Sequence, residues 1–255
     1  MNTKRLFSAA LAVILCGVLS SCGTGTGTTA TTGESTDAQT TAAQVQETAA
    51  PSSAESAEIL NFVPPQKGEK IAVITVKDYG TIKIKLFPEA APKAVENFVG
   101  LAEMNYYDEL IFHRIIPQFM NQGGDPRGNG TGGQSMWGDK FDGGIPEGLY
   151  HFSGAVAYAN SGSTSTNGSQ FYIVNTDIGY IYGGPMDNYD VPQNVKDMYN
   201  EKGGTPFLDG GYTVFGQVFE GYDVVQAISK VETDENDKPL KQVMIESIRI
   251  VEYEG

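Results

Sequence analysis

The chain of 255 residues carries 31 acidic side chains against 17 basic ones, which gives a formal net charge of −14 at pH 7. A protein this acidic is expected to repel nucleic acids and anionic lipid headgroups, so neither should bind it through a basic patch. The length allows one large domain or two small ones, with enough chain for an ordinary hydrophobic core.

The N-terminus has the pattern of a secretory signal peptide. Lys4 and Arg5 precede an apolar run over residues 6–19, which is shorter than the roughly 20 residues that a transmembrane helix needs. The small residues before Cys22 resemble the lipobox of bacterial lipoproteins, which predicts cleavage and a diacylglyceryl group on Cys22. An uncleaved anchor and a plain secretory signal are the alternatives. We expect residues 1–22 to be a lipoprotein signal peptide and the protein to be extracytoplasmic, lipid-anchored to a bacterial membrane.

A polar tether is expected to follow the signal peptide. Residues 23–66 are rich in Thr, Ala, Ser, Gly, Gln and Glu, and they hold too few large apolar side chains to fold. As a coil this segment has an end-to-end distance of roughly 35 Å, enough to hold a domain off a membrane surface. Because Cys16 leaves with the signal peptide and Cys22 carries lipid, the folded part should contain neither a disulfide nor a thiol nucleophile.

Hydrophobic periodicity predicts a mainly β domain over residues 67–255. The apolar run 71–76 and the alternating run 82–86 predict a hairpin around Tyr79-Gly80. A helix is expected to begin at Ala91-Pro92, because proline is tolerated in the first helical turn. The other expected elements are strands at 112–116, 119–120, 154–159, 170–174, 213–219 and 242–253, and a second helix at 222–229.

Short strands with only two helices predict a closed eight-stranded antiparallel β-barrel capped by the helices. The polar segment 176–205 interrupts this pattern with tyrosines and glycines that are typical of a loop. A surface helix within residues 190–202 fits its second half, but its amphipathicity is too weak to predict a separate domain.

The stretch 112–125 places one guanidinium among apolar residues. Arg114 lies between Phe112 and Ile115, and the side-chain amide of Gln122 follows eight residues later. Burying an arginine is costly unless another group holds it, so this pair is a candidate functional site. A surface arginine whose stem lies along the sheet is the alternative, and the stretch alone does not decide between them.

Other motifs do not indicate a cofactor or a metal. The glycines over 128–133 match G-x-G-x-x-G, but no helical pattern follows them, so a loop with tight turns is the better interpretation. His113 and His151 lack a metal-ligand spacing, and the acidic run 232–237 lacks the glycine and final glutamate of a calcium loop. No G-x-S-x-G elbow of a serine hydrolase is present.

Three separated stretches together resemble the cyclophilin family of peptidyl-prolyl isomerases. They are Phe-His-Arg-Ile-Ile-Pro over 112–117, Asn-Gly-Ser-Gln-Phe over 167–171 and Phe-Leu-Asp-Gly-Gly-Tyr over 207–212, in the family's order. The resemblance implies that Arg114 is the catalytic arginine and that Gln122 holds it. It further implies a substrate-binding set of Phe119 and Met120 in the proline pocket, Ala159, Asn160 and Ser161 beside the residues that precede proline, Gln170 in the groove, and Tyr172, Phe207, Leu208 and Tyr212 in the remaining pocket positions.

Three of these residues depart from the best-known family pattern. Tyr172 stands where phenylalanine is usual and is expected to bring a hydroxyl to the pocket. Phe207 replaces the tryptophan associated with tight cyclosporin binding, so binding of cyclosporin-type inhibitors should be weak. Tyr212 replaces a frequent histidine.

Rotation about a prolyl bond makes and breaks no covalent bond, so it needs no nucleophile, metal or cofactor. The resemblance therefore implies a peptidyl-prolyl cis-trans isomerase that assists the folding of extracytoplasmic proteins. The expected partners are proline-containing polypeptides and the membrane, through Cys22, and we expect a monomer. A proline-segment binding module or holdase with incidental turnover is the main alternative, and a cell-surface adhesion protein is a third.

Overall fold

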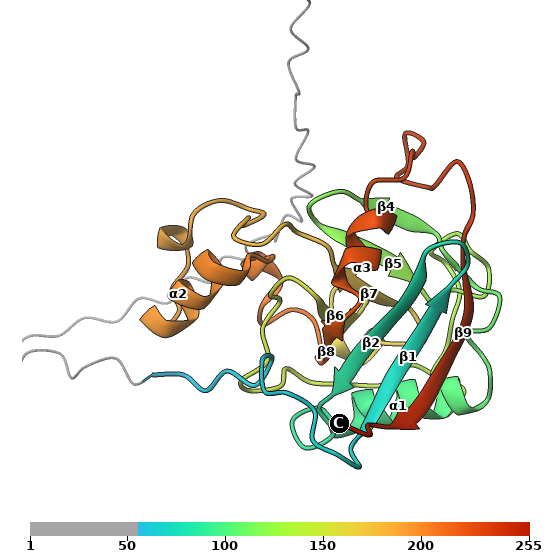
Figure 1. Cartoon of the computed structure of the whole chain (residues 1–255), viewed down its shortest axis with the longest axis horizontal. Coiled ribbons are helices and arrows are strands. Elements are labelled where there is room, and N and C mark those ends of the chain that lie inside the picture. The colour runs from blue at the N-terminus through green and yellow to red at the C-terminus, as the bar shows by residue number, and fades with distance from the viewer. Residues whose placement is uncertain (1–55) are drawn as a thin grey trace, which may run out of the picture. The chain divides into compact units, whose positions relative to one another are not determined.

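The computed structural model describes residues 56–255, so the expected signal peptide, Cys22 and most of the expected tether lie outside the described residues. Within them, nine strands form one antiparallel sheet in the order β3-β9-β1-β2-β8-β6-β7-β5-β4 (Figure 1). The strands are β1 (Lys70–Val76), β2 (Gly80–Leu86), β3 (Ile111–Phe112), β4 (Arg114–Ile116), β5 (Met120–Gly123), β6 (Ala155–Tyr158), β7 (Phe171–Val174), β8 (Val214–Glu220) and β9 (Val243–Glu252). The α-helices are α1 (Pro92–Glu103), α2 (Gln193–Lys202) and α3 (Tyr222–Ile228).

The sheet closes almost completely into a barrel because its two end strands are consecutive in the chain. β3 ends at Phe112 and β4 begins at Arg114, with only His113 between them. The backbone N–H of His113 donates to the carbonyl of Gln122 at 2.9 Å, so pairing with β5 continues across the break. The predicted barrel is confirmed, but the expected strand 112–116 is divided in two, which raises the strand count from eight to nine.

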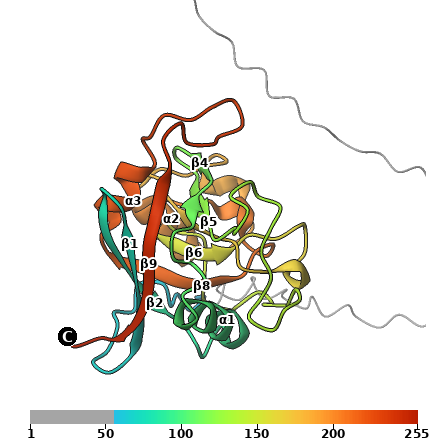
Figure 2. The same ribbon diagram turned by 90° about the vertical axis from the view of Figure 1, so that its right-hand side faces the viewer.

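Helices α1 and α3 lie toward opposite ends of the barrel, as Figure 1 and the turned view in Figure 2 show. α1 begins with Pro92 at its first position, as predicted, and its buried face includes Phe98 and Leu101. The ring of Phe98 packs on Phe171 from β7 and Phe215 from β8, with centroids 5.5 and 5.0 Å apart. Each such fully buried side chain stabilises the fold by about 1.5–3 kcal/mol.

The segment 176–205 contains α2 and has a small apolar cluster of its own. The predicted surface helix is confirmed, although it begins later, at Gln193. Val195 and Tyr199 are its buried residues, and the ring of Tyr199 packs on Phe152 with the centroids 4.3 Å apart. Its weak amphipathicity reflects this narrow contact with the rest of the domain.

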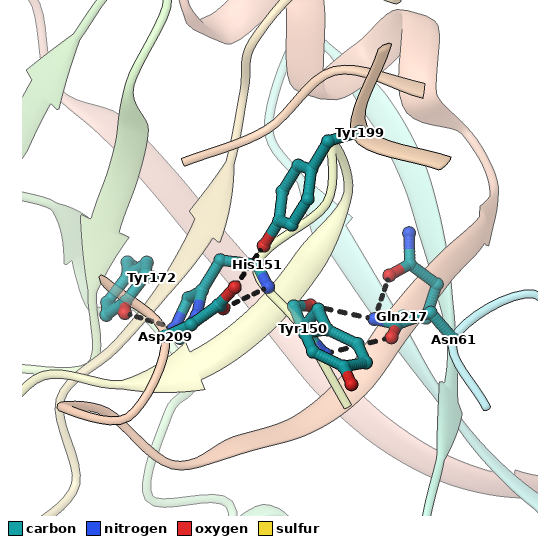
Figure 3. Close-up of polar contacts among 7 residues, drawn as sticks. All are labelled: Asn61, Tyr150, His151, Tyr172, Tyr199, Asp209 and Gln217. Carbon is teal, nitrogen blue, oxygen red and sulfur yellow. Dashed lines mark hydrogen bonds and ion pairs between the residues drawn. The ribbon is translucent and has the colours of Figure 1, made fainter. Parts of the chain in front are cut away.

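Residues 57–63, which we call the strap, pack on the domain although the sequence analysis assigned them to the tether. Asn61 is only 2% exposed, and its side-chain amide donates to the Tyr150 carbonyl and to Gln217, both at 2.9 Å (Figure 3). The N–H of Tyr150 donates in return to Asn61 at 3.0 Å. Ala57 exchanges two further hydrogen bonds with the side chain of Asn194 on α2. The expected tether boundary at residue 66 is therefore wrong, because these polar contacts leave no mark in composition.

Replacing Asn61 with alanine is expected to lower the free energy of unfolding by about 2 kcal/mol, because buried polar groups of Tyr150 and Gln217 lose their partner. Urea denaturation measures the change. The exposed Asn129→Ala variant on the glycine-rich loop is a composition-matched comparison. An unchanged midpoint for Asn61→Ala would show that the strap adds nothing to stability.

Candidate active site

A pocket of about 190 Å³ opens where β4, β5 and β7 meet the loops that follow β6 and precede β8. Nine of the twelve expected site residues line it, so the barrel brings together positions that are almost a hundred residues apart. A larger cavity of about 420 Å³ lies beside the strap and α1 and contains none of the twelve. The lining residues of the smaller pocket are Arg114, Phe119, Met120, Gln122, Ala159, Asn160, Tyr172, Leu208 and Tyr212.

Strand register explains how four of the strands build the pocket. Arg114 on β4 lies opposite Gln122 on β5, Gln122 lies opposite Tyr172 on β7, and Tyr172 lies opposite Ala157 on β6. Directly opposed residues in an antiparallel sheet project to the same face. These residues therefore form one row across the sheet, with the guanidinium at one end. Met120, two positions before Gln122, projects to that same face.

The guanidinium of Arg114 has a different partner from the one expected. Its Nε lies 3.3 Å from the Asp237 carboxylate, whereas the amide of Gln122 donates to Gln170 at 2.9 Å. Asp237 has a φ of 63° in the turn before β9, and its carbonyl accepts from the N–H of Ile115 at 2.8 Å. The acidic run 232–237, which does not have the pattern of a calcium loop, therefore supplies the partner of Arg114. Since 44% of the Arg114 side chain is exposed, this ion pair contributes little to stability.

A second pocket of about 280 Å³ adjoins the first and shares Gln122, Ala159 and Asn160 with it. The expected residues Ser161 and Gln170 lie here. The two pockets are continuous at these shared residues and together form a groove.

The glycine-rich loop 128–133 forms one wall of this groove, in agreement with its interpretation as a tight-turn loop. The amide of Gln170 donates to the carbonyls of Gly130 and Gly132, at 3.0 and 2.9 Å. Below the loop lies Asp125, only 1% exposed, which accepts from the backbone N–H groups of Arg127, Asn129 and Gly130. Asp125 therefore holds the loop that orients Gln170.

Burial opposes ionisation of Asp125, but the backbone N–H donors outweigh it and hold the pKa of the carboxyl below its ordinary value of 3.8. Its contribution to stability is thus present above pH 3.8 and is lost as pH falls through the lower, folded-state pKa. Asp125→Asn is expected to lower the free energy of unfolding by about 1–3 kcal/mol at pH 7. Urea denaturation of both proteins between pH 7 and pH 3 measures the difference. A difference that stays constant over this range contradicts the prediction.

Phe207 does not line the pocket but lies at its rim, 46% exposed. Its ring centroid is 5.7 Å from that of Phe119 and 5.8 Å from that of Tyr182. Tyr182 in turn stacks on Phe119 at 5.0 Å with 14° between the ring planes. Tyr182 belongs to segment 176–205 and was not among the expected site residues.

The hydroxyl of Tyr172 is bonded within the protein and is not presented to the pocket. It lies 2.9 Å from Nε2 of the buried His151, whose Nδ1 lies 2.7 Å from Asp209 (Figure 3). Because a carboxylate can only accept, His151 carries a proton on Nδ1, and in the neutral ring Nε2 accepts from Tyr172. Burial raises the pKa of Tyr172 well above its ordinary value, so the hydroxyl remains a donor. The expected pocket hydroxyl is thereby corrected to a structural one.

Asp209 connects this chain of hydrogen bonds to α2. Its second oxygen accepts from the Tyr199 hydroxyl at 2.7 Å, and its first also accepts from the backbone N–H of His151 at 3.0 Å (Figure 3). Burial and the Asp209 charge raise the pKa of Tyr199, which keeps this donor protonated too. Tyr172, His151 and Tyr199, which are buried, and Asp209, which is partly buried, thus form a hydrogen-bonded network that we call the pocket relay.

Comparison with known proteins agrees with this geometry. The family model described as cyclophilin type peptidyl-prolyl cis-trans isomerase/CLD matches residues 71–250. A Staphylococcus aureus protein described as a peptidyl-prolyl cis-trans isomerase is 44% identical over 188 residues, covering 73% of this chain and 94% of that protein. A Streptococcus pyogenes protein described as a bifunctional phosphatase and peptidyl-prolyl cis-trans isomerase is 46% identical, covering 72% of this chain. This chain spans only 39% of that longer relative.

Solved structures lead to the same family. A crystal structure of a cyclophilin type peptidyl-prolyl cis-trans isomerase from Cryptosporidium parvum matches with a TM-score of 0.58 and 31% identity, covering 72% of this chain and 98% of that one. The structure of the same protein in the presence of the dipeptide Ala-Pro matches with a TM-score of 0.57. This chain therefore belongs to the cyclophilin-type peptidyl-prolyl cis-trans isomerase family.

Proposed function

We propose that this protein accelerates rotation about Xaa–Pro bonds in polypeptides, with the proline ring in the 190 Å³ pocket and Arg114 as the catalytic residue. The observation that carries the proposal is one guanidinium at the edge of a pocket otherwise lined by uncharged, largely apolar side chains. The Cryptosporidium parvum relative studied in the presence of Ala-Pro supports proline as the ligand.

The chemistry requires differential binding of a twisted amide. Resonance sets a barrier of about 18–20 kcal/mol, and uncatalysed exchange of prolyl bonds takes tens to hundreds of seconds. In the twisted state conjugation is lost, and the lone pair localises on the proline nitrogen. A guanidinium that donates to this nitrogen stabilises the twisted state more than either planar isomer. No proton is transferred in this step.

The remaining pocket residues hold the substrate for this rotation. Phe119, Met120 and Leu208 offer apolar surface to the proline ring. The segment from Ala159 to Ser161 borders the two pockets, and the backbone of Asn160 is the part of it that we expect to pair with the residues that precede proline, because the N–H groups of Ala159 and Ser161 already donate to Gln170 and Thr166. Gln122, held by Gln170, lies beside Arg114 and orients the preceding carbonyl.

Exchange spectroscopy by NMR tests the activity directly, because it needs no coupling protease. Catalytic amounts of the full chain should raise the cis–trans exchange rate of a short proline peptide in proportion to protein concentration. Saturable binding without faster exchange would contradict the proposal and favour the proline-segment holdase.

The same proposal places the protein outside the cytoplasm, held by a lipid on Cys22 and acting on proteins that emerge from translocation. Its support is the apolar run 6–19 and the small residues before Cys22. Radiolabelled palmitate should be incorporated into the wild type but not into Cys22→Ser. Equal labelling of both would remove the anchor from the proposal while leaving the isomerase intact.

A further inference from the structure

Three aromatic rings extend the 190 Å³ pocket at Phe119, a residue that the 280 Å³ pocket does not share. Phe119 lines the proline pocket, and Tyr182 and Phe207 pack on it and on each other, with centroids 5.0–5.8 Å apart. Phe207 is 46% exposed, and Phe119 and Tyr182 are half-buried. We call these three residues the aromatic shelf.

The shelf has a defined place along a bound polypeptide. The 280 Å³ pocket shares Gln122, Ala159 and Asn160 with the proline pocket but does not include Phe119. Under the proposed function the residues that precede proline run toward Asn160, so the chain after proline leaves on the Phe119 side. One extended residue advances about 3.3–3.6 Å, so the side chain that follows proline reaches rings about 5 Å from Phe119.

Backbone contacts hold the shelf in place before any substrate arrives. The N–H of Tyr182 donates to the carbonyl of Gly204 at 3.0 Å, and the N–H of Gly204 donates to Tyr180 at 2.9 Å. Gly204 has a φ of 145°, and a Cβ there would clash with the His151 carbonyl oxygen, so only glycine permits this approach. A surface already ordered in the free protein loses little entropy when a ligand binds.

The pocket relay fixes the other half of the shelf. Phe207 lies in the short 3-10 helix Pro206–Leu208, and Asp209 follows this helix directly. Because His151 and Tyr199 both bond the Asp209 carboxylate, the turn that carries Phe207 is anchored to the barrel and to α2 (Figure 3). A partly exposed cluster of rings whose backbone is held in place in this way is typical of a recognition surface.

We propose that Tyr182 and Phe207 determine specificity, by binding an aromatic side chain at the position immediately after the proline of the substrate. The inference rests on the proposed function and adds a substrate class to it, namely Xaa-Pro-aromatic sequences. Offset or edge-to-face contacts between rings contribute about 0.5–1.5 kcal/mol beyond burial, which corresponds to about a twofold to tenfold preference in kcat/KM.

The test uses two peptides that differ only in having Phe or Ala after the proline. Both carry acetylated and amidated ends, because terminal charges would respond to the acidic protein. NMR exchange on the full chain gives kcat/KM for each peptide, and the quantity compared is the kcat/KM of the Phe peptide divided by that of the Ala peptide. We expect a ratio of about 2–10 for the wild type that falls toward one in Tyr182→Ala and in Phe207→Ala.

Control variants separate recognition from general damage. Tyr182→Phe keeps the ring and should keep the ratio. Trp137→Ala removes a ring of similar exposure, 45%, that packs on Phe141 outside both pockets, and should also keep it. Equal losses on both peptides in Tyr182→Ala would indicate only a structural role and overturn the inference.

Measurements on the wild type distinguish a failure of the shelf inference from a failure of the proposed function. If it isomerises both peptides with equal kcat/KM, the shelf inference fails and the proposed function stands. If it isomerises neither, the proposed function itself fails.

Discussion

Arg114→Ala is expected to lower kcat/KM for prolyl isomerisation by about two to three orders of magnitude. Removing one preorganised donor from a transition state costs about 3–4 kcal/mol, and here the donor is lost only from the twisted amide. The substrate still fits the apolar pocket, so most of the loss should appear in kcat and little in KM. NMR exchange at several peptide concentrations separates the two parameters.

The fold should survive this change, since 44% of the Arg114 side chain is exposed and its one ion pair within residues 56–255 is with Asp237 at 3.3 Å. Surface pairs of this kind contribute about 0–1 kcal/mol. Arg249→Ala provides the matched control, because it removes an exposed arginine from its pair with Asp108, outside both pockets. Turnover of Arg114→Ala within twofold of the wild type would exclude the guanidinium as the catalytic group.

His151→Phe should reduce the free energy of unfolding by about 2–4 kcal/mol, the largest stability effect that the site predicts. The substitution leaves the buried hydroxyl of Tyr172 without an acceptor and the Asp209 carboxylate without the ring Nδ1 donor, while the backbone N–H of residue 151 still bonds Asp209. Each buried polar group left unsatisfied costs about 1–3 kcal/mol. Urea denaturation of both proteins measures the difference.

A double-mutant cycle tests whether this cost runs through the pocket relay. In a Tyr172→Phe background the hydroxyl is already gone, so His151→Phe should cost about 1 kcal/mol less than in the wild type. Additive effects of the two substitutions would mean that the 2.9 Å contact between them carries no energy. The Tyr172→Phe variant also restores the side chain that is usual in the family.

The barrel and most of the pocket could be predicted because their information is local. Alternation in residues 82–86, the proline that opens α1 and the apolar runs around Arg114 each determine one element, whatever lies elsewhere in the chain. Once those strands pair in register, Arg114, Gln122 and Tyr172 must share one face. Nine of the residues that the resemblance to the cyclophilin family named therefore line one pocket.

The amino-acid sequence by itself thus determined the family, the barrel and the pocket lining. Only the tertiary structure decided that Asp237 pairs with Arg114, that His151 bonds Tyr172 behind the pocket, and that Asn61 of the strap bonds Gln217. These contacts join residues 123, 21 and 156 positions apart. A hydrogen bond between distant side chains depends on how the barrel closes, and a short polar residue such as Asn61 carries no periodic signal before that happens.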